Sequence, residues 1–303
     1  MTYPGPAGGL LRLTIWCLFL LLPLAHAGEV VFAYYNLKNY LVMNRRSPDG
    51  VSAELPKPKD EVEAVVSMIE SIDPDILGVA EIGDAQMLSD FQKRLSKAGM
   101  EFPHAELVRG FDEVRHLALL SKHPISARNS LSDVPLELNG KLYRMGRGIL
   151  DATVDIDGVP VRFVGLHLKS KRKVPEYDEA KFRAKEAIAV RNHLEKILSS
   201  SPHQRVLIFG DFNDTKNEFA VKHIVGPRGG STSLKALPLL DPRGESWTHF
   251  WAFADIYSRI DFLMVSESLW PAVSLDRSGV GMGSDWETAS DHRPLFTTFS
   301  LSK

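Results

Sequence analysis

The chain has 303 residues, of which 44% are hydrophobic, and its 36 basic and 38 acidic side chains leave a formal net charge of −2 at pH 7. This balance excludes binding of a polyanion through bulk positive charge, so such binding requires a local basic patch. The single cysteine, Cys17, lies in an N-terminal apolar segment, which excludes disulfides and thiolate metal sites from the rest of the chain.

The N-terminal segment has the pattern of a secretory signal. Arg12 precedes an apolar run over 13–24, and the small-residue motif Ala-His-Ala follows at 25–27. The run is shorter than the roughly 20 apolar residues that span a bilayer. We therefore predict a signal peptide over 1–27, a single domain over 28–303, and export to the periplasm or the extracellular space. An uncleaved anchor is the alternative.

Short apolar segments predict strands along the whole remaining chain. They cover 30–35, 76–80, 116–120, 148–156, 161–166, 205–210, 260–265 and 295–300. The pair Asp157–Gly158 separates the fourth and fifth segments and predicts a tight hairpin, because both residues tolerate positive φ.

Three other segments, 60–72, 88–95 and 187–197, have apolar residues at helical spacing. Asp60 with Glu63 predicts a capping-box-like start for the first helix, and Gly99 predicts the end of the second. Two sheets packed face to face, with helices outside, would bury this many strands and helices in one domain.

Polar side chains recur at the ends of the predicted strands. Asn36, Glu81 and His167 each follow one, Asp211 and Asn213 follow another, and Ser-Asp-His at 290–292 precedes the last. A single polar residue at a strand end can be explained as a strand cap. The same explanation would have to hold independently at all five strand ends. The oxygen atoms of these side chains are hard ligands that favour a divalent cation. The sequence has no HExxH motif of a zinc site and no G-x-S-x-G elbow of a serine hydrolase. The set therefore favours attack of water on a phosphorus ester.

Seven segments, taken in chain order, resemble the successive motifs of the endonuclease/exonuclease/phosphatase family. They are YNLKN (35–39), ILGVAEIGD (76–84), LALLSKHPI (117–125), GLHLKSK (165–171), IFGDFND (208–214), RIDFLMVS (259–266) and SDHRPL (290–295). The resemblance implies an α/β protein with a four-layer α/β/β/α sandwich of two packed, mainly antiparallel sheets, as in deoxyribonuclease I.

The same resemblance implies a metal site. Glu81 would bind the ion, Asn36 would lie next to the metal and the phosphate, and Asp291 would support the metal or its waters. Mg²⁺ or Mn²⁺ is expected, and Ca²⁺ also suits oxygen ligands.

The resemblance also implies five catalytic residues. Asp211 would orient or deprotonate the attacking water, and Asn213 would hold the phosphate or the nucleophile. Asp261 would orient His292, whose imidazole contacts the phosphoryl group or assists proton transfer. His167 would stabilise charge on the phosphoryl oxygens. The neighbouring Asp214 is assigned to a turn or cap instead.

A basic run at 169–173 follows His167 directly and offers a surface for a polyanion. The residues expected to bind substrate are Lys169, Lys171, Arg172 and Lys173 of this run, with Lys38 and Arg147 on the same rim. A solvated loop is the alternative explanation of the run.

The sequence therefore favours an exported, divalent-metal-dependent phosphodiester hydrolase that acts on DNA or RNA and has no stable membrane span after signal cleavage. One alternative is a phosphoesterase for phospholipid head groups or inositol phosphates, and another is a catalytically inactive binding module of this fold. No exposed apolar hairpin is evident for a lipid substrate. Trp247, Phe250 and Trp251 are assigned to core or loop packing, and His249 is a candidate to line the cleft.

Overall fold

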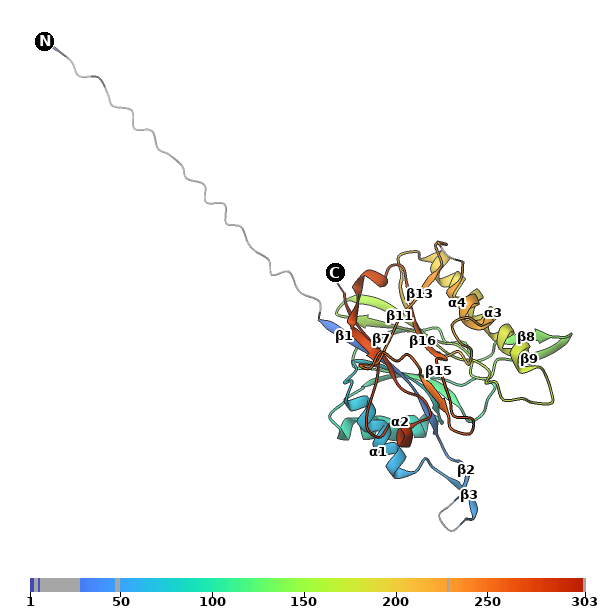
Figure 1. Ribbon diagram of the computed structural model, residues 1–303. Helices are drawn as coiled ribbons and strands as arrows, with labels where there is room; N and C mark the ends of the chain where they lie inside the picture. The colour runs from blue at the N-terminus through green and yellow to red at the C-terminus, as the bar shows by residue number, and fades with distance from the viewer. Residues whose placement is uncertain (3–4, 6–27, 47–49, 228, 302–303) are drawn as a thin grey trace.

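The computed structural model describes residues 1–2, 5, 28–46, 50–227 and 229–301 (Figure 1). Apart from residues 1–2 and 5, the predicted signal peptide lies outside the described residues. Within the described part of the chain, no helix combines the length and apolar character needed to cross a membrane.

The body of the protein is built from two six-stranded sheets. The first has the order β17 (Val273–Val280), β18 (Leu295–Ser300), β1 (Glu29–Tyr40), β4 (Ile76–Ile82), β6 (His116–Ser121) and β5 (His104–Val108). The second has the order β13 (Leu234–Ala236), β16 (Asp261–Ser266), β12 (Arg205–Asp211), β11 (Val159–His167), β10 (Leu150–Ile156) and β7 (Ile125–Arg128). The pairs β1–β4 and β11–β12 are parallel and the other pairs in both sheets are antiparallel. All eight predicted strands are confirmed.

Helices cover the outer face of each sheet. Figure 1 shows α1 (Lys59–Glu70) and α2 (Ala85–Lys97) together on one side of the sheets, and α3 (Glu179–Ser200) and α4 (Phe219–Val225) on the other. A short helix, α5 (Trp286–Ala289), also packs against α1. One apolar cluster fills the space between the sheets, and one lies between each sheet and its helices. The four-layer α/β/β/α sandwich is therefore confirmed.

The inter-sheet layer is centred on the ring of Phe209, which packs against Phe32 with ring centroids 5.1 Å apart. A Cβ atom at Gly78 would lie 2.4 Å from this ring, and one at Gly165 would lie 2.6 Å from it. Glycine at both positions therefore lets the two sheets approach around one aromatic side chain.

Most of the predicted local signals agree with the structure. Asp157 and Gly158 have φ of 53° and 86°, as the predicted tight turn requires, and Gly99 follows α2 with φ of 86°. The predicted capping box at Asp60 is wrong, because α1 begins at Lys59 with Pro58 as N-cap and no side-chain cap bond. Asp60 thus lies inside the first turn, where its charge favours the helix dipole.

Three small hairpins extend from the sandwich and were not predicted. They are β2 (Met43–Arg46) with β3 (Ser52–Leu55), β8 (Pro135–Leu138) with β9 (Lys141–Arg144), and β14 (His249–Trp251) with β15 (Ile256–Ser258). A 3₁₀ helix also spans Trp270–Ala272. The β14–β15 hairpin is joined to the segment before β18, because Phe250 donates a backbone hydrogen bond to Asp291 O at 2.8 Å.

Candidate active site

Strand register brings three of the predicted residues side by side. His167 ends β11, Asp211 ends β12 and Asp261 begins β16, and the three are direct partners across the sheet. Phe209, two residues before Asp211, belongs to the inter-sheet core, so strand alternation turns this row toward the first sheet.

Glu81 reaches the same place through a β-bulge. Ala80 packs between the sheets and Ile82 packs on the outer face, although Glu81 lies between them. The register of β4 shifts at this point, and Glu81 has φ of 61°. A bulge of this kind redirects a side chain next to a functional site. Glu81 Oε1 thereby lies 4.0 Å from His167 Nε2.

Three nitrogen atoms surround one carboxylate oxygen of Asp211. Its Oδ2 lies 3.3 Å from Asn36 Nδ2, 3.6 Å from His167 Nε2 and 3.8 Å from His292 Nε2. Its Oδ1 accepts the backbone N–H of Asn213 at 2.8 Å. Burial raises the pKa of Asp211, and the charge of Asp261 raises it further. A carboxylate with a raised pKa is a stronger base.

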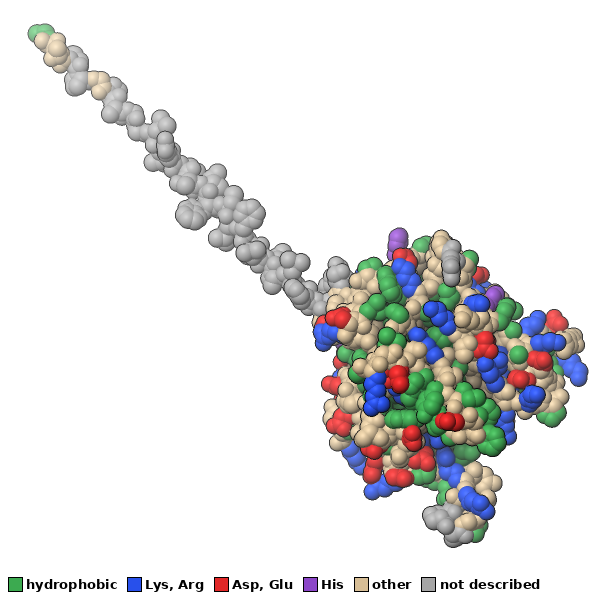
Figure 2. Space-filling model, viewed as in Figure 1, with side chains coloured by type: hydrophobic (Ala, Val, Ile, Leu, Met, Phe, Trp, Pro, Cys, Tyr) green, Lys and Arg blue, Asp and Glu red, His purple; other side chains and the backbone are tan. Residues whose placement is uncertain are grey.

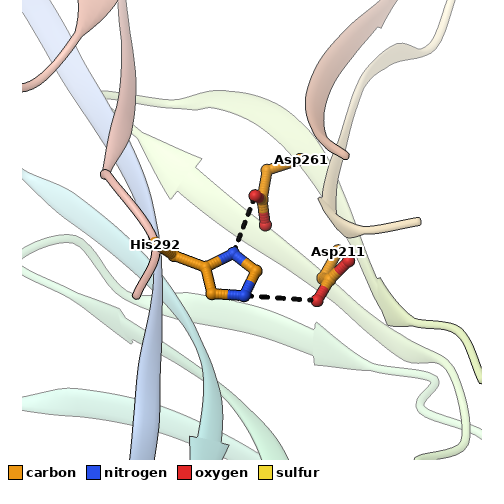
Figure 3. A group of neighbouring side chains, drawn as sticks. All are labelled: Asp211, Asp261 and His292. Carbon is orange, nitrogen blue, oxygen red and sulfur yellow. Dashed lines mark hydrogen bonds and ion pairs between the residues drawn. The ribbon is translucent and has the colours of Figure 1, made fainter. Parts of the chain in front are cut away.

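His292 is held by Asp261, whose Oδ2 accepts a hydrogen bond from Nδ1 at 2.8 Å (Figure 3). Burial by itself lowers the pKa of the imidazole, but Asp261, Asp211 and Asp291 outweigh burial and raise it to about 10. The ring is therefore an imidazolium at neutral pH, with Nε2 directed at Asp211 (Figure 3).

His167 is neutral, unlike His292. Burial, followed by the positive charge of Arg147 and His292, lowers its pKa well below the ordinary value. Among the described residues, its Nδ1 has no hydrogen-bond partner. A neutral imidazole next to a charged one gives the site two different donors for an anionic group.

These residues open into a cavity of about 450 Å³. It is lined by Lys38, Asn39, Glu81, Arg115, Arg147, His167, Ser170, Arg172, Asp211, Asn213, His249, Ile260, Asp291 and His292. His249 thus lines the cleft as predicted. The sequence reasoning missed Arg115, whose position before β6 becomes informative only when β6 is known to run antiparallel to β4.

The basic residues of the run at 169–173 differ in the contacts that their side chains make. Arg172 lines the cavity, whereas Lys171 Nζ pairs with Glu218 at 2.8 Å. Lys169 Nζ turns back to the carbonyl oxygens of Ser170 and Arg172, at 3.2 and 3.0 Å. Lys173 is exposed and is not among the residues that line the cavity. Of the four predicted cations in this run, the structure brings Arg172 to the cavity.

Asn213 and Asp214 differ in role although they are adjacent. Asn213, with φ of 51°, lines the cavity while its Nδ2 donates to Leu168 O at 3.0 Å. Asp214 is buried, accepts from Arg183 Nε at 2.6 Å and accepts the backbone N–H of Ala220 at 3.1 Å. Asp214 therefore fixes α4 to α3, consistent with its assignment to a turn or cap.

The donor atoms suit a hard divalent cation. Within the described residues, a carboxylate oxygen of Asp211 and one of Asp261 lie within 4.8 Å of each other. Asp261 Oδ1 is buried without a hydrogen-bond partner in that same part of the chain. Glu81 and Asp291 add further carboxylates to the cavity. Oxygen-rich sets of this kind bind Mg²⁺, Mn²⁺ or Ca²⁺.

The β14–β15 hairpin, whose His249 lines the cavity, exposes aromatic rings. Trp251 is 51% exposed and Phe253, in the turn, is 91% exposed. Trp251 packs against Phe253 within the hairpin, with ring centroids 5.9 Å apart, but both rings stay exposed, so the expectation that an exposed apolar hairpin is absent is wrong. Phe250 does pack as predicted, stacked on Tyr257. Figure 2 shows the hydrophobic side chains gathered around β15.

A family profile described as "Endonuclease/Exonuclease/phosphatase family" matches residues 34–292. A search of curated proteins finds no significant match. Solved structures share the fold over most of the chain.

Truncated TDP2 from Caenorhabditis elegans has 18% identity and a TM-score of 0.60, covering 90% of this chain and 98% of its own. The catalytic domain of human Nocturnin with bound sulfate has 16% identity and a TM-score of 0.61, covering 90% and 94%. Sphingomyelinase C from Streptomyces griseocarneus has 13% identity and a TM-score of 0.58, covering 90% and 99%. At these identities the similarity shows the fold alone.

Proposed function

This chain belongs to the endonuclease/exonuclease/phosphatase family, and we propose that it is a divalent-metal-dependent phosphodiesterase that acts on nucleic acid. The observation that carries this proposal is the convergence of His167 and His292 on Asp211 Oδ2, at 3.6 and 3.8 Å. This arrangement puts one base, Asp211, and two hydrogen-bond donors, His167 and His292, within reach of one tetrahedral phosphate group.

The proposed chemistry is attack of water on phosphorus. Asp211 accepts a proton as the water oxygen bonds to phosphorus, and the bond from phosphorus to the leaving alkoxide breaks. The imidazolium of His292 and the neutral imidazole of His167 donate to the non-bridging oxygens, where negative charge grows. A divalent cation, when bound, would neutralise part of the same charge. Glu81, Asn36 and Asp291 are proposed to hold it, with Asp211 and Asp261 close by.

Cations around the cavity support a nucleic-acid substrate. Lys38, Arg115, Arg147 and Arg172 line it together with the acidic cluster. Contacts to phosphates supply much of the affinity of proteins for nucleic acids, so a cationic rim suits a polymer with several of them. The signal-like N-terminal pattern leads us to propose that the enzyme acts after export, in the periplasm or outside the cell.

The exposed hairpin favours a second candidate substrate, a phospholipid head group. Residues 251–257 contain one acid and no base, and Trp251 and Phe253 expose their rings on the hairpin whose His249 lines the cavity. Aromatic side chains of this kind partition into the interfacial region of a bilayer. The reaction at phosphorus would be unchanged.

A substrate panel tests both candidates. Purified protein with Mg²⁺ or Mn²⁺ would be assayed on single-stranded DNA, double-stranded DNA, RNA, sphingomyelin vesicles and inositol phosphates. We expect turnover of at least one nucleic acid, with loss of activity in His292→Ala. Turnover of lipid or inositol phosphates alone would refute the nuclease proposal. Binding of nucleic acid without turnover of any substrate would point to an inactive binding module.

A further inference from the structure

Two arginines that line the cavity share one carboxylate. Asp112 Oδ2 lies 3.5 Å from Arg147 Nη2 and 3.9 Å from Arg115 Nη1. Arg115 Nε also donates to Asn39 Oδ1 at 2.8 Å and lies 4.0 Å from Glu81 Oε2. We propose that Arg115 and Arg147 form a subsite for a second phosphate of the substrate, next to the phosphate that reacts between His167 and His292.

Arg147 is presented by a turn that is fixed from both sides. Gly146 O accepts the backbone N–H of Asp112 at 2.7 Å, and Gly146 N–H donates to the buried carboxylate of Glu186 at 3.4 Å. Gly148 has φ of 67°, and a Cβ there would lie 2.4 Å from Leu131 O. The segment therefore holds its arginine in one place without a long flexible loop.

Arg115 is positioned by the turn that precedes it. Asp112 Oδ1 accepts the backbone N–H groups of Val114 and Arg115, both at 3.1 Å. One carboxylate therefore fixes the local chain through Oδ1 and lies between the two guanidinium groups through Oδ2. Two guanidinium groups offer ten N–H donors, and one carboxylate oxygen occupies few of them.

Arg147 retains a donor for a ligand. Its side chain is 12% exposed, and within the described part of the chain its buried Nε has no hydrogen-bond partner. A buried N–H of this kind is normally satisfied, so an anionic ligand would supply the acceptor that Nε lacks. A guanidinium group that reaches a phosphate bonds through two N–H groups at once, which a lysine cannot do.

The size of the cavity supports a ligand larger than one phosphate. Its volume of about 450 Å³ lies in the range that holds a whole small ligand. Arg172 and Lys38 line the same space, so four cations offset Asp112 and the cavity carboxylates of Glu81, Asp211 and Asp291. This inference rests on the proposed function, and it predicts a preference for a nucleotide substrate that carries two phosphates over one that carries a single phosphodiester.

The test compares the dinucleotide dTpdT with its 5′- and 3′-phosphorylated forms. We expect the wild-type protein to cleave one phosphorylated form with a kcat/KM at least tenfold above that of dTpdT. In Arg147→Gln, this ratio should fall below threefold, because kcat/KM should fall more for the phosphorylated form than for dTpdT. Arg147→Lys should lie between the two, because it keeps the charge but loses the planar donors. Arg144→Gln, at an exposed arginine paired with Asp133, is the matched control and should keep the full ratio.

A binding measurement separates this inference from the proposed function. Calorimetry in the His292→Ala background should show tighter binding of the phosphorylated dinucleotide than of dTpdT, with the difference lost on adding Arg147→Gln. If no phosphodiester is hydrolysed but this difference is found, the proposed function fails and the subsite stands. Equal binding of both dinucleotides to the parent, or equal losses for both in Arg147→Gln, would overturn the subsite.

Discussion

Nδ1 of His292 lies 2.8 Å from Oδ2 of Asp261, and the two residues are 31 positions apart in the chain. The bond fixes which nitrogen of the ring faces the cavity and favours the imidazolium form. Asp261 Oδ1 has no partner in the described part of the chain, so the histidine is the main contact of this buried carboxylate.

The first prediction treats these two residues as one unit. His292→Ala should lower kcat by roughly 10²–10⁴-fold, the usual contribution of a general acid–base group. Asp261→Asn should reproduce much of this loss, and the double variant should be little worse than His292→Ala alone. If the fold-losses in kcat of the two single variants multiplied in the double variant, the two residues would act independently. Asp276→Asn, at an exposed aspartate on β17, is the matched control.

The second prediction separates activity from stability at Asp211. Asp211→Asn should lose roughly 10²–10⁴-fold in kcat because the base for the water is removed. Burial disfavours the ionised carboxylate, so removing its charge should leave Tm, measured in EDTA, unchanged or higher. A loss of activity below about threefold, or a large fall in Tm, would contradict the proposed role.

The third prediction concerns the metal. EDTA should abolish hydrolysis and added Mg²⁺ or Mn²⁺ should restore it, because the cavity offers carboxylate and amide oxygens. Glu81→Gln should shift the metal titration of activity to higher concentration. The exposed Glu113 provides the matched control, Glu113→Gln. Full activity in excess EDTA would refute the metal assignment.

The fourth prediction concerns pH and Glu186, which lies buried on α3. Burial raises its pKa from 4.5 to about 7, although the backbone N–H of Lys169 and the charge of Arg147 oppose this shift. The folded state therefore holds this proton more tightly than the unfolded chain. The stabilisation is present in full below pH 4.5 and is lost as pH rises to about 7, a change of about 3 kcal/mol in the free energy of unfolding.

Glu186→Gln should remove this pH dependence. The test is urea unfolding of both proteins from pH 4 to pH 8, with the difference between their unfolding free energies plotted against pH. The loss of one accepted backbone hydrogen bond in the variant adds an offset that does not change with pH. A flat difference would mean that Glu186 ionises normally in the folded state.

The fifth prediction concerns which residues of the basic run contact DNA. Arg172→Gln alone should weaken DNA binding and reduce the log–log salt slope by roughly 0.7–0.9, the contribution of one phosphate contact. Lys173→Gln should have little effect, because Lys173 is exposed and lies outside the cavity lining. If neutralising Lys169, Lys171 and Lys173 together changed the slope as much as Arg172→Gln does, the contacts of this loop would rearrange on binding.

The sequence by itself determined much of the fold and predicted most of the proposed catalytic set. Apolar runs such as 205–210 are local signals of buried strands, and the eight strands predicted from them are present. The polar residues at their ends, including Asp211 and His167, were recognisable because strand ends in a packed sandwich gather at one edge. The resemblance to a known family supplied their proposed roles.

Only the tertiary structure decided how charge is arranged around that set. Whether a lysine reaches the cavity depends on distant partners, as in the pairing of Lys171 with Glu218, 47 positions away. Arg115 joins Arg147 through Asp112 because strand pairing and the turn at Gly146 bring separate loops together. Exposure of Trp251 likewise depends on which face of β14 the sandwich leaves uncovered. Such contacts are long-range, and neither periodicity nor motif spacing carries information about them.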